Sequence, residues 1–358
     1  MSRKIEKAVN EFNQQMKPVS LWADAWKRLR RNKMALISLW VVGFYALVAV
    51  TAPLFSFLDY RTQVIEHANL PPSLRPAGEL VIEKLEARHA LIKGRVDEGM
   101  DSLKPEMERI EADIQKAKDE LDTNPVNKKV YIFGTDSLGR DMLSKTIYGA
   151  RISMMVGLVG TLTAVFVGIL IGAISGYIGG WLDNLLMRFV DIMYGLPYML
   201  IVIILMAMFR KEGQSSIVIL FVGIALVSWL TIARVVRGQI ISLKNSEFVE
   251  AARSMGASTG RIIFRHLLPN TIGVIIVFTS LSLPSFIMNE SFLSFLGIGV
   301  SAPLSSWGSL VSEGANTMEL YPWQLLAPAI EMTVFLFFMN FLGDGLRDAL
   351  DPQSKNRT

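Results

Sequence analysis

The sequence predicts an all-α polytopic membrane protein with six transmembrane helices. Hydrophobic residues make up 51% of its 358 residues and charged residues only 19%, and its mean hydropathy is positive. Soluble domains are usually less apolar than this. The chain also contains six apolar runs of roughly the 20 residues that a helix needs to cross the hydrocarbon core of a bilayer. These runs lie at about 34–55, 153–179, 189–209, 215–234, 271–292 and 325–343.

The positive charges predict how these helices are oriented, because lysines and arginines collect in cytoplasmic loops next to spans. A basic cluster precedes the first run, the loop at 235–270 is also basic, and no Lys or Arg occurs between His266 and Leu346. We therefore expect both termini in the cytoplasm, in a multi-pass protein of the cell (inner) membrane. The basic cluster consists of Lys27, Arg28, Arg30, Arg31 and Lys33.

The predicted organisation has five parts. Residues 1–33 form a cytoplasmic N-terminus with an interfacial helix, 34–55 the first transmembrane helix, 56–152 an extracytoplasmic segment with a helical hairpin insertion, 153–343 the transmembrane core with the cytoplasmic loop 235–270, and 344–358 a cytoplasmic tail. The interfacial helix is expected because apolar residues recur on one helix face, opposite the basic cluster. These residues are Trp22, Ala25, Trp26 and Leu29.

The hairpin is expected from two helix-forming stretches in the outer segment. The first is 80–96, and the second has apolar residues at alternating intervals of three and four. The second stripe is Met107, Ile110, Ile114, Ala117 and Leu121, and the turn is expected near Gly99 and Pro105. The hairpin is either a solvated spacer or an arm that docks a partner.

Small residues recur every fourth position in the second apolar run, at Gly160, Ala164, Gly168, Gly172 and Gly176. Such a face lets another helix approach closely. The neighbouring helix could belong to this chain or to a partner.

The cytoplasmic loop contains a short amphipathic helix. Phe248, Ala251, Ala252 and Met255 follow the spacing of one helix face, and Gly256 stands where a helix would stop. Glu250 flanks this face. So small a helix is not expected to bury an apolar face by itself, so the face must lie on lipid, on neighbouring spans or in a groove of another protein.

Residues for catalysis or metal binding are not expected. The chain has no GxxxxGK[ST] phosphate loop and no HExxH or GxSxG motif. It has no cysteine, and its three histidines lie far apart, so neither a metal site nor a disulfide is predicted. The net charge is +4, but the basic residues lie beside apolar runs rather than in one domain, so no nucleic acid partner is expected.

Two carboxylates in the apolar runs are candidates for a substrate pathway. Glu331 stands inside an otherwise uncharged span, and Glu290 lies near the outer end of the fifth. An ionisable group is costly in a membrane and tends to face a cavity. The alternative for Glu331 is a hydrogen bond in helix packing, and for Glu290 a cap or interface contact.

The loop motif resembles a known family. Residues 250–257, EAARSMGA, followed by Leu268 and Pro269, are similar to the EAA loop of binding-protein-dependent ABC importer permeases. Further segments resemble the peptide and nickel branch of that family, namely FGTD at 133–136, GRD at 139–141, YGAR at 148–151, ESFLSFLG at 290–297, PLSSWG at 303–308 and GDGLRDALDP at 343–352. GANTME at 314–319 is similar to the oligopeptide permease C subunits. Two departures are Lys145, where arginine is more usual, and an outer segment, at about 60–128, that is longer than usual.

The resemblance implies the type I ABC importer permease fold and a non-catalytic subunit. It implies a heterodimer with a B-type permease, two cytoplasmic ABC ATPase subunits, an extracytoplasmic peptide-binding protein and the lipid bilayer as partners. This chain would bind no cofactor, whereas the ATPases would use ATP and Mg. The segment from Glu250 to Gly256, with Phe248, would sit in the ATPase groove.

The first hypothesis is therefore a permease subunit for oligopeptide import, forming half of the translocation pathway. Within the same family, dipeptide, nickel or peptide-antibiotic import is the alternative. A self-sufficient channel or secondary transporter is the alternative from another class, with Glu331 as part of its machinery. A third possibility is a non-transporting membrane anchor whose hairpin recruits partners.

Overall fold

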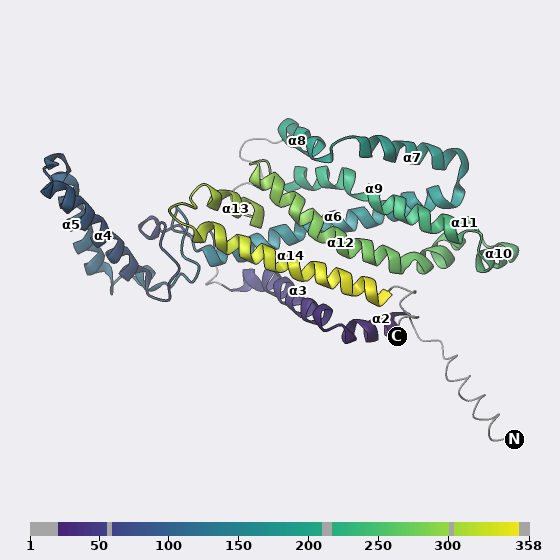
Figure 1. The fold of residues 1–358 in the computed structure, drawn as a ribbon, viewed down its shortest axis with the longest axis horizontal. Coiled ribbons are helices and arrows are strands. Elements are labelled where there is room, and N and C mark those ends of the chain that lie inside the picture. The colour runs from purple at the N-terminus through teal and green to yellow at the C-terminus, as the bar shows by residue number, and fades with distance from the viewer. Residues whose placement is uncertain (1–20, 56–58, 210–216, 301–303, 351–358) are drawn as a thin grey trace, which may run out of the picture.

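The computed structural model describes residues 21–55, 59–209, 217–300 and 304–350, and the secondary structure of these residues is helical (Figure 1). The main helices are α2 (Leu21–Arg31), α3 (Lys33–Thr51), α4 (Ala77–Asp97), α5 (Lys104–Glu120), α6 (Met142–Ile178), α7 (Gly180–Gly195), α8 (Tyr198–Phe209), α9 (Ile217–Leu243), α10 (Glu247–Ser254), α12 (Leu268–Phe295), α13 (Trp307–Ala315) and α14 (Trp323–Leu350). Short elements are α11 (Thr259–Arg261), the π-helix η5 (Ile262–Leu267) and the 3₁₀ turns η1 (Ala52–Leu54), η2 (Ile65–His67), η3 (Asp101–Leu103) and η4 (Pro125–Lys128). Most of the predicted cytoplasmic N-terminus and tail, residues 1–20 and 351–358, lies outside the described part.

Five segments of the described chain are long and apolar enough to cross a membrane, and they contain α3, α6, α9, α12 and α14. The sixth candidate span is α7 with α8, two helices bent by 80°. The third predicted span, at 189–209, therefore falls on this bent pair. Leu196 has extended backbone and precedes Pro197, and a residue before proline disfavours the helical conformation.

Three predicted boundaries fall inside helices. The helix α6 begins at Met142 rather than 153, α9 continues to Leu243 past the predicted loop start at 235, and α14 continues to Leu350 past 343. Hydropathy marks only the part of a helix that lies in hydrocarbon, so polar helical extensions are missed. At α6 the start is set by Asp141, whose carboxylate accepts hydrogen bonds from the backbone N–H groups of Leu143 and Ser144, both at 3.2 Å.

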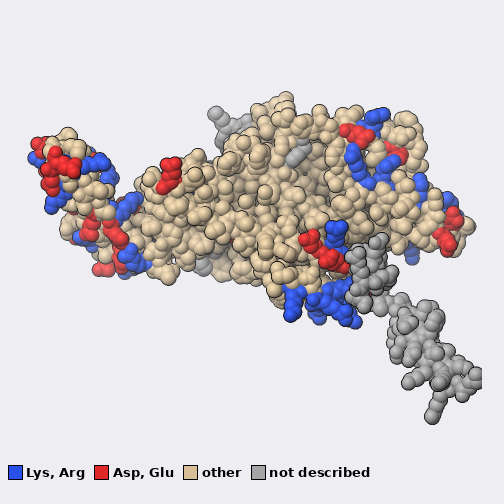
Figure 2. All heavy atoms as spheres, in the orientation of Figure 1, with Lys and Arg blue, Asp and Glu red and all other residues tan. Residues whose placement is uncertain are grey.

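The molecule is elongated, with the helical hairpin α4–α5 at one end and α10 at the other (Figure 1). Charged side chains gather towards the two ends, whereas the middle of the bundle shows almost none (Figure 2). Large apolar side chains point outward from the spans, such as Trp40, which is 75% exposed, and Phe166, which is 74% exposed. A surface of this kind requires lipid or another apolar partner.

The neighbour of the glycine face on α6 is α9 of the same chain. The helices are so close that a Cβ atom on Gly172 would collide with the carbonyl oxygen of Ala233, and one on Gly168 would lie 2.6 Å from the Cβ of Ile232. Small residues here allow the tight backbone approach that stabilises helix pairs in lipid.

We expect Gly172→Leu to separate α6 from α9 and to lower the stability of the folded protein by roughly 1–3 kcal/mol, the usual cost of overpacking. Gly43→Leu is the matched control, because Gly43 lies in α3 with open space around the position of its Cβ. Thermal unfolding of both variants in detergent measures the difference. Equal melting temperatures would contradict the packing role of Gly172.

The predicted hairpin is formed by α4 and α5, which end and begin on either side of η3. Its base packs tightly on the loop that leads to α6. A Cβ on Gly78 would lie 2.6 Å from a methyl group of Leu121 and 2.9 Å from the Cβ of Asn127. Leu70, Ala77, Leu80 and Tyr131 form a small buried core beneath it.

Candidate functional site

The short helix α10 divides its apolar residues between two opposite environments. Val249 is fully buried and Ala252 is 2% exposed, and both belong to a core with Ile262, Ile263 and Leu267 of η5. Part of the predicted face, Ala252, thus lies on neighbouring helices, which is one of the three places expected for it. Val249 is not one of the positions i, i+3, i+4 and i+7 counted from Phe248, so this spacing does not predict its burial. With Ala252 it forms the inner face of α10.

The outer face of α10 remains open. Phe248 is 39% exposed and Met255 is 81% exposed, with Ala251 and Glu250 also at the surface. Of the predicted docking residues, Ala252 is unavailable because it is buried within this chain. Phe248, Ala251 and Met255 form what we call the α10 outer face, and an apolar face at a helix surface calls for a partner groove.

Gly256 ends α10 as the sequence predicts. Its φ of 76° lies in the left-handed region, which glycine adopts without strain. The N–H of Ala257 donates to the carbonyl of Ala252 at 3.1 Å, and the N–H of Gly256 donates to that of Arg253 at 3.0 Å. These two bonds form a Schellman motif, which fixes where the chain leaves the helix.

A groove of about 630 Å³ runs within the membrane-spanning region, between the α7–α8 bend, α9 and α12. Its lining combines apolar side chains with neutral polar ones and includes no charged residue. The polar members are Tyr194, Ser228, Thr231, Ser282, Ser285 and Asn289. These residues are far apart in the sequence, in α7, α9 and α12, and only the fold brings them together.

The polar groups of the groove differ in how they are satisfied. The hydroxyls of Ser282 and Ser285 donate to carbonyls of their own helix, at 2.7 and 3.2 Å. The hydroxyls of Tyr194 and Thr231 share a hydrogen bond of 2.6 Å. The side chain of Asn289 has no hydrogen-bond partner among the residues that the structure describes, so its amide is available to a ligand.

Glu290 lies beside Asn289 in sequence but does not line the groove. Its side chain is fully buried, and it accepts hydrogen bonds from Ser153 of α6 at 2.9 Å and from Ser294 at 2.6 Å. The Ser153 hydroxyl also accepts from the backbone N–H of Trp307, at 3.1 Å. Glu290 therefore joins α6, α12 and the start of α13, which is a structural position.

Glu331 lies in a different groove. This second groove, of about 850 Å³, is mostly apolar and runs along α3, the start of α6 and α14. The Tyr45 hydroxyl donates to the backbone carbonyl of Glu331 at 3.5 Å. Glu290 of α12 does not line this groove. The two glutamates nevertheless lie on helices that pack together, because the Ser291 hydroxyl beside Glu290 donates to the sulfur of Met332 beside Glu331 at 3.3 Å.

Two family models match the chain. The model described as "Binding-protein-dependent transport system inner membrane component" matches residues 168–356, more than half of the chain. The chain belongs to this family. The model described as "N-terminal TM domain of oligopeptide transport permease C" matches residues 20–72 of the same permease. The resemblance stated from the motifs and the type I permease fold it implied are thereby confirmed.

Similar proteins extend over the whole permease. The oligopeptide transport system permease protein OppC of Salmonella typhimurium is 42% identical over 357 residues, 99% of each chain, and that of Escherichia coli K12 is 41% identical over the same share. The dipeptide transport system permease protein DppC of Bacillus subtilis is 37% identical over 336 residues, 94% of this chain and 87% of that one. Among solved structures, the inward-facing methionine ABC transporter MetNI has a TM-score of 0.46 at 18% identity, covering 59% of this permease and 98% of that chain.

A buried ion cluster holds the outer end of the permease together. Lys145 of α6 is 1% exposed, and its amine lies 2.9 Å from carboxylate oxygens of both Asp136 and Glu313. Arg140 pairs with Asp136 at 2.7 Å. Burial alone would raise the pKa of Asp136, but Lys145 and Arg140 outweigh it, so the pKa lies below its ordinary value. The cluster links the outer loop, α6 and α13.

The hairpin base of the permease is fixed by a second buried network. The imidazole of His67 lies 3.1 Å from the Tyr131 hydroxyl and 3.1 Å from the Asn127 side-chain oxygen. Burial lowers the pKa of His67 and raises that of Tyr131 to about 12, so both groups are neutral around neutral pH. A neutral network of this kind holds the hairpin against the body without a charge.

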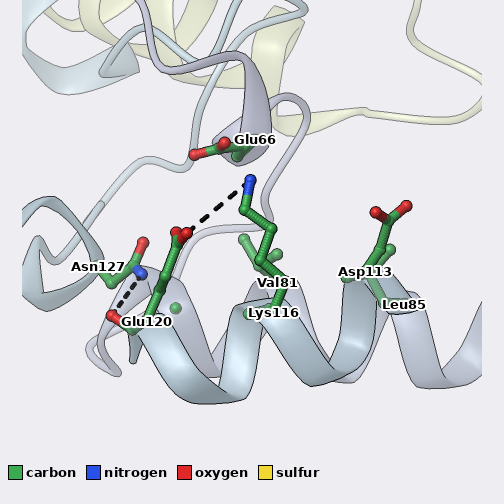
Figure 3. Close-up of a pocket in the computed structure, with 9 residues that line it drawn as sticks. Glu66, Val81, Leu85, Asp113, Lys116, Glu120 and Asn127 are labelled. Carbon is green, nitrogen blue, oxygen red and sulfur yellow. Dashed lines mark hydrogen bonds and ion pairs between the residues drawn. The ribbon is translucent and has the colours of Figure 1, made fainter. Parts of the chain in front are cut away.

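A small cavity of about 220 Å³ opens beside this network, between α4, α5 and η2 (Figure 3). Lys116 points between Glu66 and Glu120, and its amine is 3.8 Å from the Glu120 carboxylate. Asp113 lies one turn away on α5. Among the described residues, no group of three or more His, Cys, Asp or Glu side chains could hold a metal ion, and this cavity is no exception.

Proposed function

We propose that the chain is the membrane-spanning permease subunit of an ATP-driven importer for oligopeptides and forms half of the translocation pathway. The observation that carries this proposal is the full-length similarity to proteins named oligopeptide permeases, at 42% and 41% identity. The two alignments cover 99% of this chain and 99% of each relative.

The groove between α7, α9 and α12 supports a peptide substrate. Its uncharged polar groups can meet the N–H and C=O groups that every peptide shares, while its apolar surface tolerates varied side chains. An uncharged lining also avoids selecting for one charge of substrate. We therefore infer that this groove, rather than the surroundings of Glu331 or Glu290, belongs to the pathway.

The partners follow from the same proposal. A B-type permease would complete the pathway, and an extracytoplasmic peptide-binding protein would deliver the substrate. Two ABC ATPases would drive transport, and a groove on one of them would hold the α10 outer face. ATP and Mg would be used by the ATPases, because this sequence has no phosphate-binding loop. Both termini and α10 would lie in the cytoplasm, and the hairpin outside.

Uptake by proteoliposomes tests the function. The chain is reconstituted with the B-type permease, the two ABC ATPases and the peptide-binding protein. ATP-dependent uptake of labelled pentapeptides, dipeptides and Ni²⁺ is then measured. We expect pentapeptide uptake that is lost when this chain is omitted. Uptake of dipeptides alone would favour the second candidate, which the 37% identity to a dipeptide permease supports, and flux through the chain alone would favour a channel or secondary transporter.

Asn289→Leu tests the groove. Loss of a hydrogen bond costs about 0.5–1.5 kcal/mol, so we expect peptide uptake to fall by about two- to tenfold while the complex still assembles. Asn340→Leu is the matched control, because Asn340 lies on α14 outside the groove. Unchanged uptake by Asn289→Leu would remove this groove from the pathway.

A further inference from the structure

The amphipathic helix α2 is held at a fixed place beside the inner end of α14. Leu29 is 4% exposed and packs with Ala35 and Ala349, and the position of a Cβ on Gly345 is occupied by the side chain of Ala35. Part of the apolar face predicted to lie on lipid is therefore covered by this chain. The position of α2 is set by protein packing, and its opposite face is left free.

The backbone at Asn32 breaks the helix between α2 and the first span. Asn32 is extended, with φ −84° and ψ 101°, and its side chain accepts a hydrogen bond from the N–H of Ala35 at 3.2 Å. The span α3 begins at the next residue, Lys33. Because hydrocarbon begins where α3 enters the membrane, α2 must lie at the level of the lipid headgroups.

The free face of α2 is basic. Lys27, Arg30 and Arg31 are exposed, and so is Lys33 at the start of α3, and none of the four forms an ion pair within the described residues. The acidic groups nearby are Asp24, which pairs with Arg28 at 2.8 Å, and the exposed Asp344 and Asp348 of α14. Figure 2 shows this basic group at the lower edge of the bundle, where Figure 1 places α2.

An aromatic ring lies along the same side of the helix. Trp26 is 44% exposed, and the guanidinium of Arg30 lies 4.9 Å from the centre of its ring. An indole with one apolar body and one polar edge is most stable at the boundary between headgroups and acyl chains. The Trp26 ring can thus lie at the boundary with the acyl chains while the cations lie among the headgroups.

We propose that this face of α2, made of Trp26, Lys27, Arg30, Arg31 and Lys33, binds the headgroups of anionic phospholipids. The occupant is lipid rather than protein because α3 brings a headgroup layer to this face in every molecule that is inserted in a membrane. The four cations lack acidic partners in the described part of the chain, and an anionic phosphate supplies them. Each cation is expected to strengthen the interaction about fivefold.

Lipid titration of the purified complex in detergent tests the proposal. Dioleoyl phosphatidylglycerol or phosphatidylcholine is added, and bound lipid is counted by native mass spectrometry. We expect phosphatidylglycerol to bind more tightly than phosphatidylcholine, and the variant Lys27→Gln/Arg30→Gln/Arg31→Gln/Lys33→Gln to lose at least tenfold in affinity for it. Raised salt should weaken wild-type binding, because exposed charges are screened.

Two further variants separate charge from folding. Lys93→Gln/Arg95→Gln/Lys128→Gln/Lys129→Gln removes four exposed cations from the outer segment and should bind phosphatidylglycerol as the wild type does. Lys27→Arg/Arg30→Lys/Arg31→Lys/Lys33→Arg keeps the charge of α2 and should also bind normally. Three results would overturn the proposal. The wild type could bind both lipids with equal affinity, the fourfold glutamine variant of α2 could bind phosphatidylglycerol as the wild type does, or that variant could lose ATPase subunits without losing lipid. Peptide uptake is not measured here, so failure of the proposed function would leave this result intact.

Discussion

We expect the double variant Phe248→Ala/Met255→Ala to lose peptide uptake at least tenfold while the protein still folds. Neither side chain belongs to the buried core that holds Val249 and Ala252, so their truncation leaves that core in place. In a partner groove, a central aromatic or long apolar side chain contributes roughly 2–4 kcal/mol to binding. Uptake by proteoliposomes and affinity of the ATPase subunits for the permease are the measurements.

Neighbouring alanines of α10 provide an internal control. Ala251 is exposed whereas Ala252 is 2% exposed. Ala252→Leu should therefore lower the melting temperature of the permease by overpacking, whereas Ala251→Leu should leave it unchanged and weaken only ATPase binding. Leu91→Ala, on the hairpin, should change neither property, since Leu91 is 72% exposed far from α10. Normal uptake and ATPase activity in the double variant would refute docking at this face.

Lys145→Met should lower the free energy of unfolding by roughly 3–5 kcal/mol, the cost of breaking a buried ion pair from one side. Asp136 would stay buried with Arg140 as its remaining cation, and Glu313 would lose its link between α13 and α6. Lys145→Arg keeps the charge and should be mild. Thermal unfolding in detergent at neutral pH measures both variants.

The pH dependence of this effect has a definite sign. The pKa of Asp136 is lowered from its ordinary value of 3.8 in the folded protein, so the stabilisation is complete above that value and is lost as the pH falls below it. The difference between wild type and Lys145→Met should thus be constant from pH 5 to 8 and shrink in stronger acid. The double variant Asp136→Asn/Lys145→Met should recover part of the loss, and a fully additive double variant would contradict the pairing.

The sequence was sufficient for features that depend on local spacing. The hairpin followed from a helix-forming stretch and one stripe of apolar residues, the end of α10 followed from Gly256, and the spans followed from run length. The family, too, could be inferred from short motifs, and the matching models confirm it. Each of these depends on residues that are close together in the chain.

Other features required the fold because they depend on distant neighbours. Periodicity placed Ala252 on the same face as Phe248, and only the contact with η5 shows that it is buried. Asn289 and Glu290 are adjacent in sequence, yet one faces the groove and the other accepts a hydrogen bond from Ser153 of another helix. The 80° bend between α7 and α8 was hidden by continuous hydropathy, which does not record backbone direction.

The contact of Val249 and Ala252 with η5 has a mechanical consequence. Residues from Thr259 to Phe295 form one continuous helical stretch, and at 1.5 Å per residue it is a rod of roughly 55 Å. One end of this rod is clamped to α10, and its other half forms a wall of the groove, with Pro284 as the point where a helix bends most easily. A push on α10 would therefore tilt the rod about its contacts with α6, and a small displacement at the α10 end would change the width of the groove.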